Sequence, residues 1–149
     1  MNLHFKPSEP EDEAFLRHLN QLAYEPVVVA QFGCWDPVKQ KGFFDAKWAT
    51  QRYSLIIVEG TPIGAFTSAR TESSLTLLDL LVLPTHQNRG VGTRVVQQLQ
   101  GEARTRQLPL LLQVLHLNRA RSLYERLGFR VFETTETHYR MRWEPPPAS

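Results

Sequence analysis

The stretch HQNRGVG, residues 86–92, decides how the chain is interpreted. It lies between an apolar run, LTLLDLLVLP (75–84), and a segment in which Val91, Val95 and Leu99 recur at helical spacing. A helix N-terminus offers unpaired N–H groups and a partial positive charge, and glycines let an anion approach the backbone. The stretch therefore predicts a phosphate-binding turn between a strand and a helix. The alternative is a tight turn of the same kind without a ligand.

Two common nucleotide-binding loops are excluded by residues that are absent from this stretch. A Walker A loop needs Lys-Ser or Lys-Thr directly after its glycines, but Gly92 is followed by Thr93-Arg94. A dinucleotide fingerprint needs a third glycine, and only Gly90 and Gly92 are present. The phosphate would therefore belong to another kind of ligand.

The composition is that of an ordinary globular domain. The chain has 149 residues, of which 42% are hydrophobic and 21% charged, with a net charge of +2. This mild charge does not predict nucleic-acid binding, which needs a concentrated basic face. The lone cysteine excludes an internal disulfide and favours a cytoplasmic location. No apolar run approaches about 18 residues, so no membrane span is expected. We expect one domain over residues 1–144 and a flexible tail over 145–149.

Capping and turn signals predict where the elements begin and end. Ser8 and Glu11 have capping-box spacing before a first helix, which Pro26 is expected to break or bend. Asp36-Pro37 is typical of the start of a second helix. Strands are predicted at residues 2–6, 75–83, 108–117, 129–134 and 138–143, and residues 54–66 are predicted to form strand, turn and strand with Gly60 in the turn. Two later helices are predicted at 91–103 and 118–127, and Gly128 is expected to end the second of them.

The resulting element order is β-α-α-β-β-β-α-β-α-β-β. This order predicts an α/β (α+β) fold, with a mixed central sheet of about six to seven strands and helices on both of its faces. Residues 75–117 form a strand-helix-strand unit, which is expected to be a right-handed parallel crossover. The apolar run 75–84 is expected to be covered on both faces.

A second motif, NRARSLYERLGF (118–129), follows the next apolar strand. Residues 87–92 resemble the Q/R-x-x-G-x-G/A loop of the GNAT superfamily of N-acetyltransferases. The second motif resembles that family's Asn…Ala…Leu-Tyr-Glu-x-x-Gly-Phe segment. The resemblance covers residues 75–143 well and the first 50 residues in outline. It implies a GNAT-like fold and acetyl-CoA as the acyl donor, without a metal.

The resemblance also implies which residues bind acetyl-CoA. Backbone N–H groups of the loop would hold the pyrophosphate, and strand residues would pair their main chain with the pantetheine arm, their side chains being core. Asn118 would contact the cofactor, although its alternative role is to cap the helix that follows. The implied cofactor-binding residues are Leu80, Leu81, Val82, Gln87, Asn88, Arg89, Gly90, Val91, Gly92, Thr93 and Asn118.

The implied catalytic acid is Tyr124, which would protonate the leaving thiolate because a phenol is protonated at neutral pH. Its alternative is an aromatic side chain on the buried face of a helix. The amine must also lose a proton. Some family members use a glutamate five residues before the asparagine, where this chain has Gln113. Asp79, the one charge in an apolar strand, and His116 are the candidate bases, and a water chain is a third option.

The sequence is therefore identified as a member of the GNAT superfamily. The implied function is transfer of an acetyl group from acetyl-CoA to a primary amine, by direct attack in a ternary complex. The acceptor would be a small molecule or a peptide, and the protein a monomer or homodimer. The alternative is a non-catalytic acyl-CoA-binding or sensing module of the same fold. A nucleic-acid-binding module is a distant third.

Overall fold

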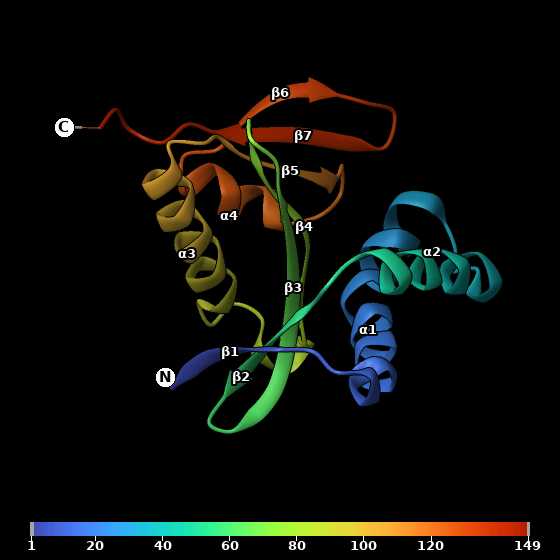
Figure 1. The fold of residues 1–149 in the computed structure, drawn as a ribbon. Coiled ribbons are helices and arrows are strands. Elements are labelled where there is room, and N and C mark those ends of the chain that lie inside the picture. The colour runs from blue at the N-terminus through green and yellow to red at the C-terminus, as the bar shows by residue number, and fades with distance from the viewer. Residues whose placement is uncertain (1, 149) are drawn as a thin grey trace. The chain divides into compact units, whose positions relative to one another are not determined.

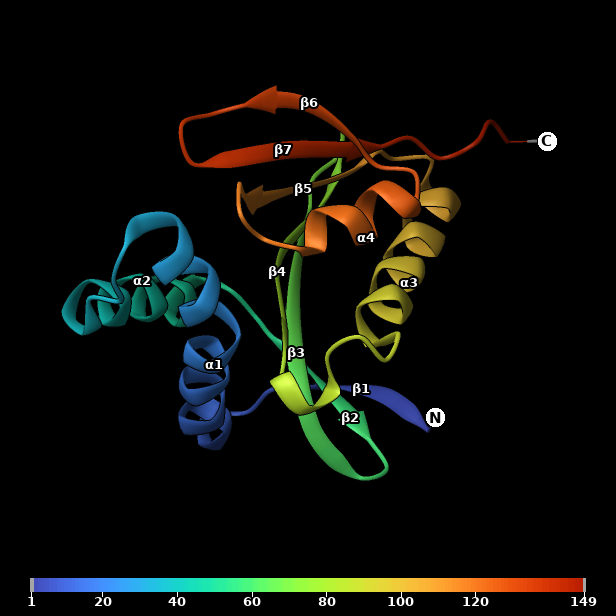
Figure 2. The ribbon, with the colours of Figure 1, turned by 180° about the vertical axis from the view of Figure 1, so that it is seen from behind.

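The computed structural model describes residues 2–148, and its elements follow the predicted order (Figures 1 and 2). The helices α1 to α4 and two short 3-10 helices are interleaved with seven strands. Their bounds are β1 Leu3–Pro7, η1 Pro10–Asp12, α1 Glu13–Phe32, α2 Pro37–Thr50, β2 Ser54–Val58, β3 Thr61–Arg70, β4 Leu75–Val82, η2 Pro84–His86, α3 Val91–Arg106, β5 Leu110–Leu115, α4 Ala120–Arg126, β6 Arg130–Thr134 and β7 His138–Trp143.

The strands form a seven-stranded mixed sheet in the order β1-β2-β3-β4-β5-β7-β6. β4 and β5 are parallel, whereas β1 with β2, β2 with β3, β5 with β7 and β6 with β7 are antiparallel. The β2–β3 turn has two residues with positive φ, Glu59 (50°) and Gly60 (80°), as a tight two-residue hairpin requires. The predicted mixed sheet and the parallel β4-α3-β5 unit are confirmed.

The chain forms two compact units. The first contains the residues up to Thr67 together with Asp79–Arg89, and the second contains Ser68–Leu78 and the chain from Gly90 onward. In the first unit, α1 and α2 lie beside each other (Figures 1 and 2). Its core combines side chains of both helices with those of the adjoining strands, namely Leu16, Leu19, Phe44, Tyr53, Leu55, Ile57, Ala65 and Leu81.

One prediction for the first helix was wrong, and of the two alternatives for Pro26 the break is excluded whereas the bend stays a prediction. The carboxylate that accepts the Glu9 N–H is that of Asp12, at 2.8 Å, whereas Ser8 donates its N–H to the Tyr53 carbonyl at 2.9 Å. Ser8 therefore bonds to the backbone of Tyr53 and is not a cap of the first helix. Pro26 lies inside α1 and does not end it. The helix ends at Gly33, whose φ of 93° is typical of a C-terminal stop.

The start of α2 is confirmed. The Asp36 side chain accepts hydrogen bonds from the N–H groups of Val38 and Lys39, and Pro37 is the first helical residue. This arrangement pairs two of the amides that a helix N-terminus leaves without intrahelical partners.

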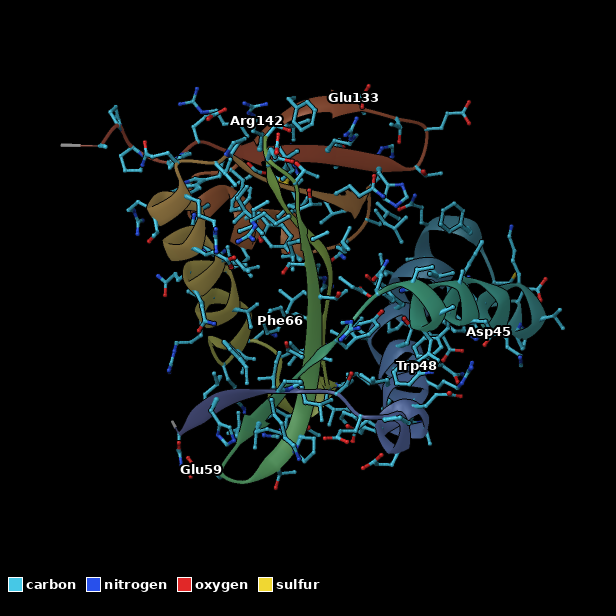
Figure 3. The ribbon with its side chains drawn as sticks, in the orientation of Figure 1. Asp45, Trp48, Glu59, Phe66, Glu133 and Arg142 are labelled. Atoms are coloured by element: carbon cyan, nitrogen blue, oxygen red, sulfur yellow. The ribbon has the colours of Figure 1, made fainter. Side chains whose placement is uncertain are left out.

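The second unit contains α3, α4 and the C-terminal strands. Val91, Val95 and Leu99 are buried, which confirms the predicted apolar stripe of α3. The Gln100 side chain donates to the Leu127 carbonyl at 2.8 Å and so joins α3 to the end of α4. Gly128 follows α4 with φ of 97°, and its amide donates to the Glu125 carbonyl. The β6–β7 hairpin carries Glu133 and Arg142, as Figure 3 shows.

The strand β4 alternates between buried and accessible side chains. Leu75, Leu77, Asp79 and Leu81 are buried, whereas Leu78 is 43% exposed. The prediction that both faces of this apolar run are covered was wrong. The run has an apolar composition on both faces, but only one of them is fully packed, so the second face is accessible to a ligand.

Gly64 on β3 provides a test of how closely β3 and β4 pack. A Cβ at this position would lie 2.5 Å from the Leu81 carbonyl oxygen, which is backbone and cannot move aside easily. We expect Gly64→Ala to lower the free energy of unfolding by about 1–3 kcal/mol in urea denaturation. The control is Gly101→Ala in α3, where a Cβ meets no atom within 4 Å and alanine favours the helix. Equal stability of the two variants would contradict the close approach.

Candidate functional site

The loop that leads into α3 has the backbone conformation of an anion-binding turn. Gly90 is the N-cap of α3 and has φ of 83°, and Asn88 also has a positive φ, 62°. A Cβ on Gly90 would meet nothing within 4 Å, so its side-chain position is open. Arg94 donates its amide to the Gly90 carbonyl. The amides of residues 91–93 therefore precede the first intrahelical bond of α3 and are the groups that an anion would bind.

The residues before the loop are tied to the end of β4. The Gln87 side-chain amide donates to the Val82 carbonyl at 2.9 Å. His86 Nδ1 lies 2.9 Å from the Thr85 hydroxyl oxygen, and Arg89 is exposed. The Gln87 amide nitrogen thus has an intramolecular partner, whereas Arg89 is accessible to solvent.

The ladder between β4 and β5 is short. It contains the register pairs Leu75↔Leu110 and Thr76↔Leu111. In the second unit, a hollow of about 200 Å³ adjoins the end of this ladder. The side chains around it come from β4, β5 and the late hairpin: Thr76, Leu77, Leu78, Leu111, Leu112, Gln113, Phe132 and Arg140. The hollow is too small for a whole cofactor but large enough for a chain-like group or a side chain.

The two predicted residues of the α4 region have defined partners. The N-cap of α4 is Arg119, one residue after the predicted cap, but the Asn118 side chain still accepts a hydrogen bond from the first helical amide, that of Ala120, at 2.9 Å. Tyr124 lies within α4, is 5% exposed and packs against Phe129, with ring centroids 5.8 Å apart. Its phenol thus belongs to a largely dry environment, where a hydrogen bond to a developing charge is stronger than in water.

The loop before α3 and the helix α4 both lie in a region whose sequence matches a known family. Residues 50–131, more than half of the chain, match the family model of the acetyltransferase (GNAT) domain. The chain belongs to the GNAT acetyltransferase family. A search of curated proteins gave no significant match.

Solved GNAT structures have the same fold. The PaiA N-acetyltransferase of Thermoplasma acidophilum, in complex with coenzyme A, has a TM-score of 0.79 at 15% identity, covering 97% of this chain and 99% of that one. The ribosomal-protein-S18-alanine N-acetyltransferase of Escherichia coli has a TM-score of 0.70 at 21% identity, covering 99% and 97%. YncA of Salmonella typhimurium, with acetyl-CoA, has a TM-score of 0.62 at 16% identity, covering 100% and 97%. At these identities the likeness establishes the fold alone.

Asp79 lies at the centre of a buried polar cluster in the first unit of this GNAT domain. Its carboxylate accepts hydrogen bonds from the hydroxyls of Tyr24 (2.5 Å) and Tyr53 (2.8 Å) and from the Lys47 ammonium (2.9 Å). Lys47 also donates to the Asn20 side chain at 3.2 Å. Burial, and then the charge of Asp79, raise the pKa of the Tyr53 phenol, so Tyr53 remains a hydrogen-bond donor.

This cluster explains how a carboxylate is tolerated in the core. A buried charge is costly unless it is paired and hydrogen-bonded, and Asp79 has three donors from three different segments. The sequence left open, beside a catalytic role, that Asp79 pairs with an arginine or with the backbone of a neighbouring strand. The structure shows an ion pair, but its cation is that of Lys47. The role of Asp79 as a base stays a prediction.

His116 lies at the end of β5 in the second unit. Its ring packs against Tyr139 with centroids 4.6 Å apart, and its amide donates to the Thr137 carbonyl. Its Nε2 atom is buried and has no hydrogen-bond partner among the described residues. His116 and Tyr124 stay predicted catalytic residues. Asp79 and His116 belong to different compact units, each with its own polar neighbours.

Several polar neighbours were not found from the sequence. Tyr24, Lys47 and Tyr53 lie far from Asp79 along the chain, and no local sequence pattern pairs them with it. His138, which adjoins Thr137 at the start of β7, is likewise not marked as a site residue by any local sequence pattern. The one available signal was the isolated charge of Asp79, which required donors but did not name them.

No membrane-spanning or metal-binding feature was found within residues 2–148. No helix there is both long and apolar enough to cross a bilayer. No group of three or more histidine, cysteine, aspartate or glutamate side chains in this range is arranged to hold a metal ion.

Removal of the Asp79 carboxylate should destabilise the fold. Asp79→Ala leaves Lys47 and two phenols without their acceptor, and we expect the free energy of unfolding to fall by about 3 kcal/mol. The control is Asp45→Ala on α2 (Figure 3), because Asp45 also accepts from two cations, Lys41 and Arg17, but is solvent-accessible. Urea denaturation should give a much smaller loss for this control. Similar losses for both variants would mean that the buried cluster contributes no more than a surface pair.

Proposed function

We propose that the chain is an acetyl-CoA-dependent N-acetyltransferase that moves an acetyl group to a primary amine. The amine belongs to a small molecule or a peptide and attacks the thioester directly in a ternary complex. The observation that carries this proposal is the GNAT family match over residues 50–131, which includes both the open turn at Gly90 and the helix of Tyr124. Of the three structural neighbours described above, two are named as N-acetyltransferases, and two have coenzyme A or acetyl-CoA bound.

The start of α3 fits the diphosphate of coenzyme A. Its first amides precede the helical hydrogen-bond ladder, Gly90 leaves its side-chain position open, and the helix dipole favours an anion. The proposed diphosphate-binding residues are those of the loop, Gln87, Asn88, Arg89, Gly90, Val91, Gly92 and Thr93. Leu80, Leu81 and Val82 would bind the pantetheine arm through their main chain, and Asn118 would combine its cap with a cofactor contact.

The proposed chemistry needs an acid and a base. The bound thioester supplies an activated acyl group and a thiol leaving group. Tyr124 is proposed to donate its phenolic proton to the departing sulfur, which is consistent with a phenol that is protonated at neutral pH. An alkylamine of pKa about 10.4 is protonated at neutral pH, so a proton acceptor is also required. No step needs a metal ion.

One observation favours a second function, that of a non-catalytic acyl-CoA-binding module. The carboxylate of Asp79 is occupied by three donors, and the side chain at position 113 is an amide, which is not a base. Thiol release from acetyl-CoA, measured with a panel of small-molecule and peptide amines, separates the two functions. Tight acetyl-CoA binding without thiol release for any amine would favour the module. The cytoplasmic location and the monomeric or homodimeric state stay predictions.

A matched pair of variants tests the diphosphate site. Gly90→Asp and Gly90→Asn introduce side chains of the same shape, and both residue types tolerate a positive φ. The aspartate adds a negative charge at the proposed diphosphate. We expect the Kd for acetyl-CoA, measured by isothermal titration calorimetry, to rise at least about tenfold more for Asp than for Asn, which corresponds to about 1.4 kcal/mol. Equal affinities would contradict a diphosphate at this turn.

Substitution of the proposed acid tests the chemistry. Tyr124→Phe keeps the ring against Phe129 but removes the phenolic proton. We expect kcat to fall about 100-fold with little change in the Kd for acetyl-CoA, because the proton is needed only when the thiolate leaves. Phe129→Leu is a packing control that alters the same contact and keeps the phenol. Unchanged turnover of Tyr124→Phe on every acceptor would exclude the acid role.

A further inference from the structure

The start of β7 carries a histidine on the face of the hairpin that adjoins the hollow of the second unit. In the β5–β7 register, Leu115 lies opposite His138 and Gln113 lies opposite Arg140. Alternate strand residues share a face, so His138 and Arg140 lie on the same side as Gln113. Gln113 and Arg140 both line the hollow. His138 is the diagonal neighbour of Gln113 across the two strands, a relation that separates two residues by about 7–8 Å.

The residues that line this hollow include no free base. Gln113 has an amide, and Arg140 has a guanidinium, which remains protonated. The carboxylate of Glu133 on β6 lies 2.6 Å from the Arg140 guanidinium and is therefore paired. His138 is the next residue along this face that can take a proton, and its side chain is partly exposed.

The imidazole of His138 is held in a defined turn. Its Nδ1 lies 2.7 Å from the Thr137 hydroxyl oxygen. Its amide donates to the Thr135 hydroxyl oxygen, and its carbonyl accepts from the Thr135 amide. With Nδ1–H assigned as the donor to Thr137, Nε2 carries the lone pair. The short turn thus orients a ring whose second nitrogen can accept a proton.

The surroundings of His138 favour a neutral ring. Burial, and then the charge of His116, lower the pKa of His138 below its ordinary value, so the ring is unprotonated at neutral pH. The other charged groups around the hairpin are paired or exposed: Arg140 with Glu133, Arg121 with Glu125 of α4 near Tyr139, and Glu136 in the turn. A neutral imidazole at pH 7 is ready to act as a general base.

The geometry points to His138 as the proton acceptor for the amine. This assignment rests on the proposed N-acetyltransferase function. Nε2 of His138 takes a proton from the ammonium, and the freed amine forms the C–N bond while the C–S bond breaks. The sulfur takes the Tyr124 proton, and the resulting phenolate takes the second proton from nitrogen. The imidazolium of His138 then releases its proton to water, so one proton leaves for each acetyl group transferred.

His138 is better placed for this role than His116. The Nε2 atom of His116 is buried without a partner, and its ring is packed against Tyr139. An amine would need to displace that packing to reach it.

The first measurement needs no acceptor. Proton NMR titration of the free wild-type protein should give a His138 pKa below its ordinary value, about 6.5, and His116→Gln should raise it because the repulsion is removed. His18→Gln, an exposed histidine on α1, should leave the His138 titration unchanged. A wild-type pKa at or above the ordinary value would overturn the assignment, and so would no response to His116→Gln.

The second measurement follows kcat/KM against pH, with acetyl-CoA and the best amine of the panel. We expect His138→Gln to lower kcat/KM by about 100-fold at pH 7 and to remove the acidic limb due to the imidazole, leaving a rate that rises with the fraction of free amine. Urea denaturation checks that the variant is folded, and His18→Gln is the matched control. A wild-type profile in His138→Gln would overturn this assignment but leave the proposed function standing. Absence of turnover by the wild type with every amine would overturn both.

Discussion

The buried carboxylate of Asp79 is the constraint on which the first unit depends. A charge in a core strand is tolerated only when donors surround it, and the three donors come from α1, α2 and the residue before β2. These segments are therefore held at fixed positions relative to β4. The hydrophobic core around Leu16, Phe44 and Leu81 supplies the general attraction, whereas the polar cluster specifies which side chains meet.

The second unit follows a different principle. Its strands and helices pack through an apolar face, whereas Leu78 on β4, Gln113 on β5 and Phe132 on β6 are exposed. Polar groups of functional interest, including Gln113, Arg140 and His138, lie on β5 and β7. Exposed apolar surface beside a few oriented polar groups is typical of ligand sites. The proposed chemistry therefore uses side chains that are carried by strands of the sheet.

Local sequence signals predicted the ends of helices and strands correctly where the residue at that position has one main structural role, such as a helix cap or a turn glycine. Asp36-Pro37, Gly60, Gly90 and Gly128 mark a cap, a hairpin turn, a helix start and a helix end, as predicted. One signal failed where a tertiary contact competed. Ser8 lost its predicted capping role to a backbone bond with Tyr53. Pro26 removes one helical hydrogen bond, but α1 continues through it to Phe32.

The sequence by itself determined the element order, the mixed sheet, the turn at Gly90 and the membership of the GNAT family, because these depend on local periodicity and on motifs of consecutive residues. Only the tertiary structure decided what surrounds Asp79, which face of β4 is accessible and where His138 lies relative to Gln113. Such relations join residues far apart in the chain. A sequence states that a buried carboxylate needs donors, but the packing of helices and strands selects them.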